Sequence, residues 1–306
     1  MSAKSALAKT EKKQRRDFRG LFFISPWILG FLMFQFYPFI SSLYYSFTDF
    51  NILRPTHNFV GLDNYIRLFT IDPDFPISIR VTLLYALMSV PSKLIFALFI
   101  AMVLNMKLKG INFFRTLYYI PSILGGSVAI AALWRLMFMR EGVVNNLLAT
   151  FGIAPIAWLG SPDFALLTIS TLEVWQFGSS MVLFLAALKQ IPAELYEAAS
   201  IDGASRVSRF VRITLPMITP IIFFNLVMQT INALQNFTSA FVITGGGPLR
   251  STYLIGLMLY NEGFNHFRMG YASAISWVLF GIILILTLII FRSSNRWVYY
   301  EDKGGN

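Results

Sequence analysis

Long apolar stretches separated by short charged segments constrain the fold of this 306-residue chain more than any other feature. A helix needs about 20 apolar residues to cross the hydrocarbon layer, because every backbone polar group must be paired within the segment. The stretches that meet this need are Leu21–Phe47, Val81–Asn105, Leu117–Met139, Phe164–Leu188, Met217–Phe237 and Tyr271–Phe291. The sequence therefore predicts an all-α integral membrane protein with six transmembrane helices.

The composition points to the same class of protein. Hydrophobic residues make up 56% of the chain and charged residues only 13%, whereas a soluble domain is about one-quarter charged. The net charge of +10 does not indicate nucleic acid binding, because the basic residues flank apolar stretches instead of forming one patch. With no cysteine, and two histidines far apart, the sequence predicts neither a metal site nor catalytic residues.

The distribution of lysine and arginine predicts the orientation. Placing the N-terminus in the cytoplasm puts 17 basic residues on that side and six on the other, the bias expected of cytoplasmic segments. Both termini are then cytoplasmic. The predicted organisation is a basic cytoplasmic tail at 1–20, a transmembrane domain at 21–291 and a cytoplasmic tail at 292–306.

Four carboxamide side chains recur at helical spacing in the fifth stretch. Asn225, Gln229, Asn232 and Asn236 would fall within a narrow arc of one helical face. Because unpaired amides are costly in lipid, this face is expected to line a wet pathway or to bond to neighbouring helices. Amides donate to and accept from hydroxyl groups, and Trp175 could stack on a sugar ring.

Two charged residues lie deep within predicted spans. Lys93 falls in the second stretch and Glu173 in the fourth. A lone charge is expensive at this depth, so the two are expected either to pair with each other or to contact substrate in a wet cavity. With the four carboxamides and Trp175, they form the predicted substrate pathway.

The segment 191–216, between the fourth and fifth stretches, predicts a helix, a sharp turn and a second helix. Gly203 permits the turn, Ser205 suits the cap of the second helix, and Pro216 is taken as a boundary. The two alanines after Glu197 would let another protein's backbone approach closely. From these residues alone, the segment is either an ordinary re-entry loop or a docking surface.

The spacing in this segment resembles the Glu-Ala-Ala loop of the permease subunits of ABC (ATP-binding cassette) importers. Glu197-Ala198-Ala199, three residues, Gly203, nine residues, Ile213, one residue and Leu215-Pro216 match without insertion or deletion. Further segments resemble the sugar-importing, maltose-type branch of these permeases. These are Phe59–Tyr65, Phe114–Leu117, Ile191-Pro192, Ile201–Ala204, Ile213–Pro216, Thr244–Pro248 and Gly270–Ala274.

The resemblance implies a type I ABC importer permease in a bacterial cytoplasmic (inner) membrane. The segment 191–216 would form a coupling helix that docks on a cytoplasmic ATPase. The implied coupling residues are Glu197, Ala198, Ala199, Asp202, Gly203, Leu215 and Pro216. The implied partners are a second homologous permease, two ABC ATPases and an extracytoplasmic sugar-binding protein, besides membrane lipid. This chain would bind no cofactor, since ATP and Mg would be held by the ATPases.

Two other classes of protein are weighed against this interpretation. A membrane-embedded glycosyl or acyl transferase would use Glu173 as a catalytic acid, but it leaves the Glu-Ala-Ala segment unexplained and predicts clustered catalytic residues that the sequence does not show. A passive channel would be distinguished by uptake that needs no ATP. The sequence favours the transporter subunit, which is not itself an enzyme.

Overall fold

The computed structural model describes residues 19–54, 56–106 and 109–299 of the chain. Most of the predicted cytoplasmic tails, together with Lys107, lies outside these residues. Within them every extended element is helical, and the sole β-type pairing is an isolated bridge between Thr48 and Phe59. The all-α fold is therefore confirmed for the part of the chain that the structure describes.

Four helical segments are long and apolar enough to span a membrane, and six if each of two bent pairs counts as one span. The four are α1–η1–α2 (Arg19–Phe31, Leu32–Phe36, Tyr37–Ser46), α4 (Asp74–Leu104), α11–η2–α12 (Arg206–Arg209, Phe210–Thr214, Leu215–Leu234) and α14 (Met269–Trp297). The bent pairs are α5–α6 (Ile111–Leu124, Val128–Met137) and α8–α9 (Pro162–Trp175, Gly178–Gln190). The shorter elements are α3 (Asp63–Thr70), α7 (Val143–Thr150), α10 (Ala193–Ile201), η3 (Ala240–Thr244), α13 (Ile255–Tyr260) and η4 (Asn261–Asn265).

Helix α4 lies at the centre and packs against α8, α9 and α12. The core there contains large, fully buried side chains, among them Tyr85, Met181 and Phe184. Helix α2 packs against α14, whereas most of the α1–α2 surface is exposed. Exposed apolar side chains cover the outer faces of the long helices, as expected where lipid is the solvent.

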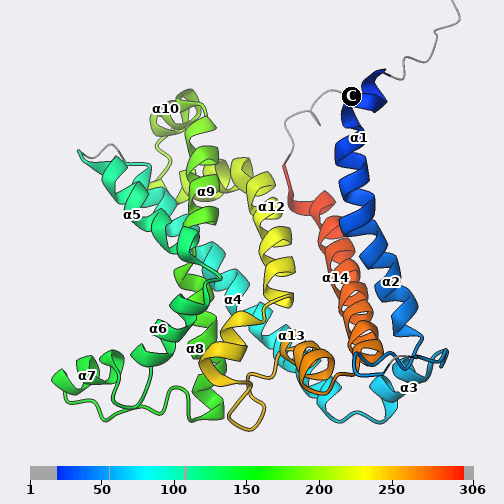
Figure 1. Cartoon of the computed structure of the whole chain (residues 1–306). Coiled ribbons are helices and arrows are strands. Elements are labelled where there is room, and N and C mark those ends of the chain that lie inside the picture. Colours follow the sequence, from blue (N-terminus) through cyan, green and yellow to red (C-terminus); the bar gives the residue numbers. More distant parts are fainter. Residues whose placement is uncertain (1–18, 55, 107–108, 300–306) are drawn as a thin grey trace, which may run out of the picture.

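The elements fall into two ends (Figure 1). Helix α10, the start of α5, the start of α1 and the end of α14 lie at one end, which we call the α10 end. Helices α3, α7 and α13 lie at the other, which we call the α3 end. The short helices thus close the two ends of a bundle whose long helices run between them.

The predicted third and fourth spans are not continuous helices. The chain bends by 103° between α5 and α6 and by 47° between α8 and α9. The first break follows from Gly125 and Gly126, since Gly126 has a φ of +77° that a residue with a side chain seldom adopts. Counting apolar residues treated each pair as one straight span, and the structure corrects this.

Two turns of π-helix each precede a proline. Element η1 ends just before Pro38, and η2 ends just before Pro216. Proline lacks an N–H and clashes with the carbonyl four residues earlier, and a wider turn relieves this clash. The helix therefore runs unbroken from Arg206 to Leu234, and the boundary predicted at Pro216 is wrong.

Candidate functional site

The break between α5 and α6 is held open by its own cap. Ser127 has extended backbone angles, and its hydroxyl accepts a hydrogen bond of 3.2 Å from the Ala129 N–H. This satisfies one of the free N–H groups at the start of α6. A side chain at Gly125 would come within 2.5 Å of the Gln176 side-chain oxygen, so the first break packs directly on the second.

The break between α8 and α9 is stabilised by a side chain from α5. The Ser122 hydroxyl donates to the Gln176 carbonyl oxygen at 3.0 Å and accepts from the Ser179 N–H at 2.9 Å. Both are backbone groups beside the bend, where regular helical bonding is interrupted. Gly178 permits this approach, because an added Cβ would lie 2.6 Å from the Tyr118 carbonyl oxygen. The two bent pairs are therefore interlocked.

A third break follows α12, which ends at Leu234. Beyond it, the Asn236 side chain donates to the Tyr85 hydroxyl at 2.9 Å and accepts from the Ser239 hydroxyl at 2.5 Å. Tyr85 comes from α4 and is fully buried. This network ties the segment between α12 and η3 to the central helix.

The three breaks meet at one small polar cavity, which we call the hinge cavity. It is lined by Tyr85, Gly126, Ser127, Ala131, Leu172, Glu173, Gln176, Asn236, Thr238 and Ser239. Its volume is about 40 Å³, enough for water but far below the roughly 300–1,000 Å³ of typical small-molecule sites. A saccharide would enter only if the elements around the breaks moved apart.

Lys93 and Glu173 form an ion pair beside this cavity. Lys93 Nζ lies 2.6 Å from Glu173 Oε1, and the side chains are 6% and 15% exposed. The structure thus realises one of the two expected arrangements, mutual pairing. Glu173 also lines the hinge cavity, so the pair joins α4 to the break after α8.

The predicted carboxamide stripe does not act as one surface. Asn225 is buried and donates to Ile221 O of its own helix at 3.0 Å, and Gln229 is buried and donates to the Ser180 hydroxyl on α9 at 3.3 Å. Asn232 is exposed, and Asn236 lies beyond the end of α12. The stripe is divided because the helix ends two residues before its last member.

Trp175 is likewise placed outside the hinge cavity. Its ring lies 5.8 Å from the Trp134 ring and packs against the core beside α6. Of the predicted pathway residues, Glu173 and Asn236 line the hinge cavity, and Lys93 is joined to it by its ion pair with Glu173. The structure does not bring Trp175, Asn225, Gln229 or Asn232 to the same cavity.

Five polar residues that line the hinge cavity were not predicted, namely Tyr85, Ser127, Gln176, Thr238 and Ser239. The glycine pair before Ser127 is a sequence signal that could have located the first break, because consecutive glycines interrupt a helix. Gln176 is a lone amide within an apolar stretch. Nothing local marks Tyr85, which meets Asn236 across 151 positions of sequence.

The segment 191–216 forms the predicted helix, turn and second helix start. Helix α10 ends in a Schellman motif, in which Ala204 N bonds to Ala199 O at 2.9 Å and Gly203 N to Ser200 O at 3.1 Å. Gly203 has a φ of +74°, the left-handed conformation that this motif needs. The Ser205 hydroxyl caps α11 by accepting from the Ser208 N–H at 3.2 Å.

One face of α10 is exposed and has no partner among the described residues. Glu197 and Ala198 are exposed there, and Ile201 beside them is 88% exposed. The opposite face is anchored, because the Tyr196 hydroxyl shares a hydrogen bond of 2.8 Å with the Thr214 hydroxyl. Of the other predicted coupling residues, Asp202 and Gly203 are exposed, whereas Ala199, Leu215 and Pro216 are half-buried.

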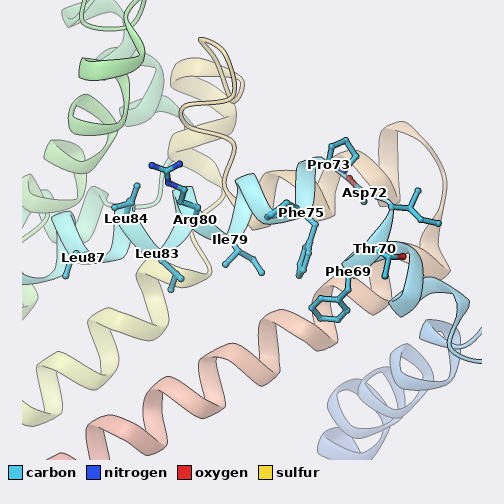
Figure 2. A pocket seen from close by; sticks show the side chains of 12 residues that line it. Phe69, Thr70, Asp72, Pro73, Phe75, Ile79, Arg80, Leu83, Leu84 and Leu87 are labelled. Atoms are coloured by element: carbon cyan, nitrogen blue, oxygen red, sulfur yellow. The ribbon is translucent and has the colours of Figure 1, made fainter.

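A larger groove of about 810 Å³ lies elsewhere, along α3 and α4. Figure 2 shows its mainly apolar side chains, with Phe69 and Phe75 facing each other at the corner between the two helices. Its Asp72 carboxylate accepts a hydrogen bond from the Tyr271 hydroxyl at 2.6 Å. The groove suits an apolar surface, and it lacks the convergent polar groups of the hinge cavity.

Comparison with known proteins identifies the family. The family described as "Binding-protein-dependent transport system inner membrane component" matches residues 78–299. The chain is 50% identical to the probable ABC transporter permease protein YesP of Bacillus subtilis over 97% of both chains. It is 35% identical to the trehalose/maltose transport system permease protein MalF of Thermococcus litoralis, over 92% of this chain and 96% of that one.

A solved structure extends the likeness to the fold. The crystal structure of a bacterial alginate ABC transporter, in complex with an alginate pentasaccharide-bound periplasmic protein, contains a chain that matches with a TM-score of 0.79. The two chains are 25% identical, and the match covers 92% of this chain and 95% of that one. The fold is therefore that of an ABC transporter permease.

Proposed function

The chain belongs to the family of binding-protein-dependent transport system inner membrane components, and we propose that it forms half of the translocation pathway of an ATP-driven carbohydrate importer. It is a permease subunit and not an enzyme, so the transferase that would use Glu173 as an acid is not supported. The proposal of a carbohydrate substrate is supported by relatives whose names include trehalose/maltose and lactose transport.

The observation that carries the proposed pathway is the meeting of three helix breaks at the hinge cavity. Discontinuous membrane helices with free polar groups mark substrate sites in other transporters. Amides, hydroxyls and a carboxylate converge here, and these groups bond to sugar hydroxyls as donors and acceptors. We assign substrate contact to Glu173, Gln176, Asn236 and Ser239, with Lys93 balancing the carboxylate charge.

The amides on α12 have a different proposed role. Gln229 joins α12 to α9 through Ser180, and Asn225 bonds within its own helix, so both hold the helices in place. Asn232, being exposed, is free to face a second permease or the pathway. Trp175 supports the Trp134 ring beside α6 and reaches substrate only after a rearrangement.

We propose that α10 is the coupling helix and docks on an ABC ATPase that holds ATP and Mg. The exposed Glu197, Ala198 and Asp202 would contact the ATPase, while Gly203 sets the turn. The half-buried residues would instead hold α10 against the start of the fifth span; these are Ala199, Leu215 and Pro216. Closure of two ATPases would then move α10 and, through the continuous helix Arg206–Leu234, the third break.

The remaining partners would be a second homologous permease and an extracytoplasmic sugar-binding protein. On this proposal the α10 end, with both ends of the membrane domain, faces the cytoplasm, and the α3 end faces the binding protein. The excess of lysine and arginine in the sequence segments predicted to be cytoplasmic supports this orientation.

Saccharide-stimulated ATP hydrolysis tests the proposal. The complex would be purified through this subunit, returned to lipid and assayed with its binding protein against a panel of saccharides. We expect an ATPase to co-purify and one class of saccharide to stimulate hydrolysis. A complex without an ATPase, or hydrolysis that no saccharide changes, would contradict the proposed function.

A further inference from the structure

A second cavity lies farther along the same elements that enclose the hinge cavity. It has a volume of about 450 Å³, within the range of typical ligand sites, and we call it the arginine cavity. Its chemically distinctive lining residues are Arg135, Phe138, Arg140 and Trp158.

A buried asparagine holds this cavity in shape. Asn145 is 2% exposed, and its amide donates to Arg140 O at 3.0 Å and to Ile156 O at 2.9 Å. Its oxygen accepts from Ile156 N and from Trp158 Nε1, each at 3.0 Å. One side chain thus fixes the backbone of Arg140 and the indole of Trp158, and both residues line the cavity.

The two arginines carry charge that no described carboxylate neutralises. Arg135 bonds only to Val242 O, at 3.3 Å, and the Arg140 guanidinium has no hydrogen bond or ion pair within the described residues. Two other arginines at the α3 end are paired, Arg250 with Asp74 and Arg268 with Glu262, whereas Arg54, Arg67 and Arg80 have no ion pair with a described residue. Guanidinium groups bind carboxylates through paired hydrogen bonds, and an aromatic face beside them suits the apolar face of a sugar ring.

The arginine cavity and the hinge cavity lie at opposite ends of the α6–η3 pair. Ala131 lines the hinge cavity and Arg135 the arginine cavity, four residues or about 6 Å farther along α6. Ser239 precedes η3 at the hinge cavity, and Thr244 ends η3 at the arginine cavity. A ligand held by the arginines would therefore lie beside the entrance to the proposed pathway.

We propose that the arginine cavity is a saccharide subsite selective for sugars that carry a carboxylate. Arg135 and Arg140 would bind the carboxylate and Trp158 would stack on the ring. This inference rests on the proposed function and narrows its substrate to acidic saccharides. Two other sources of negative charge, an anionic lipid headgroup and an acidic surface of the binding protein, are separated from it by the experiment.

The test uses the whole transporter complex in phosphatidylcholine nanodiscs without binding protein. Binding of trigalacturonate is compared with that of neutral galactotriose by isothermal titration calorimetry. We expect the acidic trisaccharide to bind at least about ten-fold more tightly, and Arg135→Gln and Arg140→Gln each to remove about that factor. Trp158→Leu is expected to weaken both ligands. Arg54→Gln, an exposed arginine outside the cavity, is the matched control and should change neither.

Several results would overturn the inference. Equal affinity for the two trisaccharides would do so, as would acidic binding that Arg140→Gln leaves unchanged. Loss of trigalacturonate binding when phosphatidylglycerol is added would assign the cavity to lipid. If Arg140→Gln weakened binding of the binding protein in the absence of sugar, the arginine cavity would be assigned to docking of that protein. If galactotriose still stimulates ATP hydrolysis in any of these cases, the proposed function stands and only the acidic subsite fails.

Discussion

The helical chain breaks at glycine both at the hinge cavity and in the segment 191–216. The polar groups around the hinge cavity are paired inside the protein, whereas those on α10 are exposed. Around the hinge cavity, Lys93 pairs with Glu173, and Ser122 satisfies the backbone on both sides of a bend. On α10, Glu197 and Ala198 face outward without a described partner. A closed polar site suits a small ligand that enters when the site opens, whereas an open face suits a second protein.

This difference makes separable predictions for substitutions in the two regions. Changes near the hinge cavity should alter the stability of the chain itself, because the interactions lost are internal. Changes on α10 should leave stability nearly intact and alter assembly. The expected loss in the free energy of unfolding falls from Lys93→Met, which leaves an internal charge unpaired, to Glu197→Lys on an exposed face.

Lys93→Met should have the largest effect. It leaves the Glu173 carboxylate buried without its partner, and breaking a buried pair in this way costs about 3–5 kcal/mol. Unfolding midpoints in detergent measure the loss. The double variant Lys93→Met with Glu173→Gln should recover most of it, because no unpaired charge remains. A double variant that loses the sum of both single effects would show that the two groups are not coupled.

Gly178→Ala should have the next largest effect. The added Cβ would press on the backbone of α5 at Tyr118 and disturb the interlocked bends, at a cost of about 1–3 kcal/mol. Gly281→Ala is the matched control in α14, where an added Cβ meets nothing within 4 Å. The control should be neutral or slightly stabilising, since alanine favours helix by up to about 1 kcal/mol. Equal melting temperatures for the two variants would count against close interlocking.

Gly203→Ala should cost the chain only about 1–2 kcal/mol, because its strain is local to the left-handed turn. It should nevertheless reduce ATPase co-purification, since the turn sets the direction in which α10 lies. Gly152→Ala is the control, with a φ of +75° and open space around it at the α3 end. The control carries the same strain but should leave the ATPase attached. Loss of the ATPase in both variants would instead indicate a general folding defect.

Glu197→Lys should change stability by less than about 0.5 kcal/mol, the usual range for exposed positions. Its effect should appear in assembly, as loss of the co-purified ATPase. Glu141→Lys makes the same charge reversal on an exposed residue at the α3 end and serves as the control. An ATPase that stays bound to the Glu197→Lys variant, with transport intact, would remove α10 as the docking surface.

The sequence was sufficient for the features that depend on local pattern. Apolar length located the membrane segments, and fixed spacing located the turn at Gly203. Two of the segments that resemble maltose-type permeases, Phe59–Tyr65 and Gly270–Ala274, lie at the α3 end, and the structure shows why their residue types are needed. The Asn64 amide donates to the carbonyl oxygens of Ser46 and Thr48, each at 2.9 Å, and any side chain at Gly270 would overlap Thr48 O.

The sequence was insufficient where distant segments decide the outcome. An apolar count cannot distinguish a straight span from two bent halves, because both bury the same residue types. The carboxamide spacing predicted one face of a helix that continues to Asn236, but α12 ends at Leu234. Tyr85 and Gln176 join the hinge cavity through contacts between helices, which leave no periodic signal. Pro216 follows a turn of π-helix inside a continuous helix, whereas the sequence alone suggested that a helix ends there.

The central claim is that the hinge cavity lies on the saccharide path, and thiol labelling tests it most directly. The chain has no cysteine, so Ser239→Cys gives this subunit a single thiol at the cavity. Ser46→Cys, fully buried on α2 away from the cavity, is the control. We predict that a water-soluble maleimide labels Ser239→Cys in the complex turning over ATP with its binding protein, and that the transported saccharide slows this labelling while Ser46→Cys stays unlabelled. A labelling rate at Ser239→Cys that neither ATP nor saccharide changes would contradict the claim.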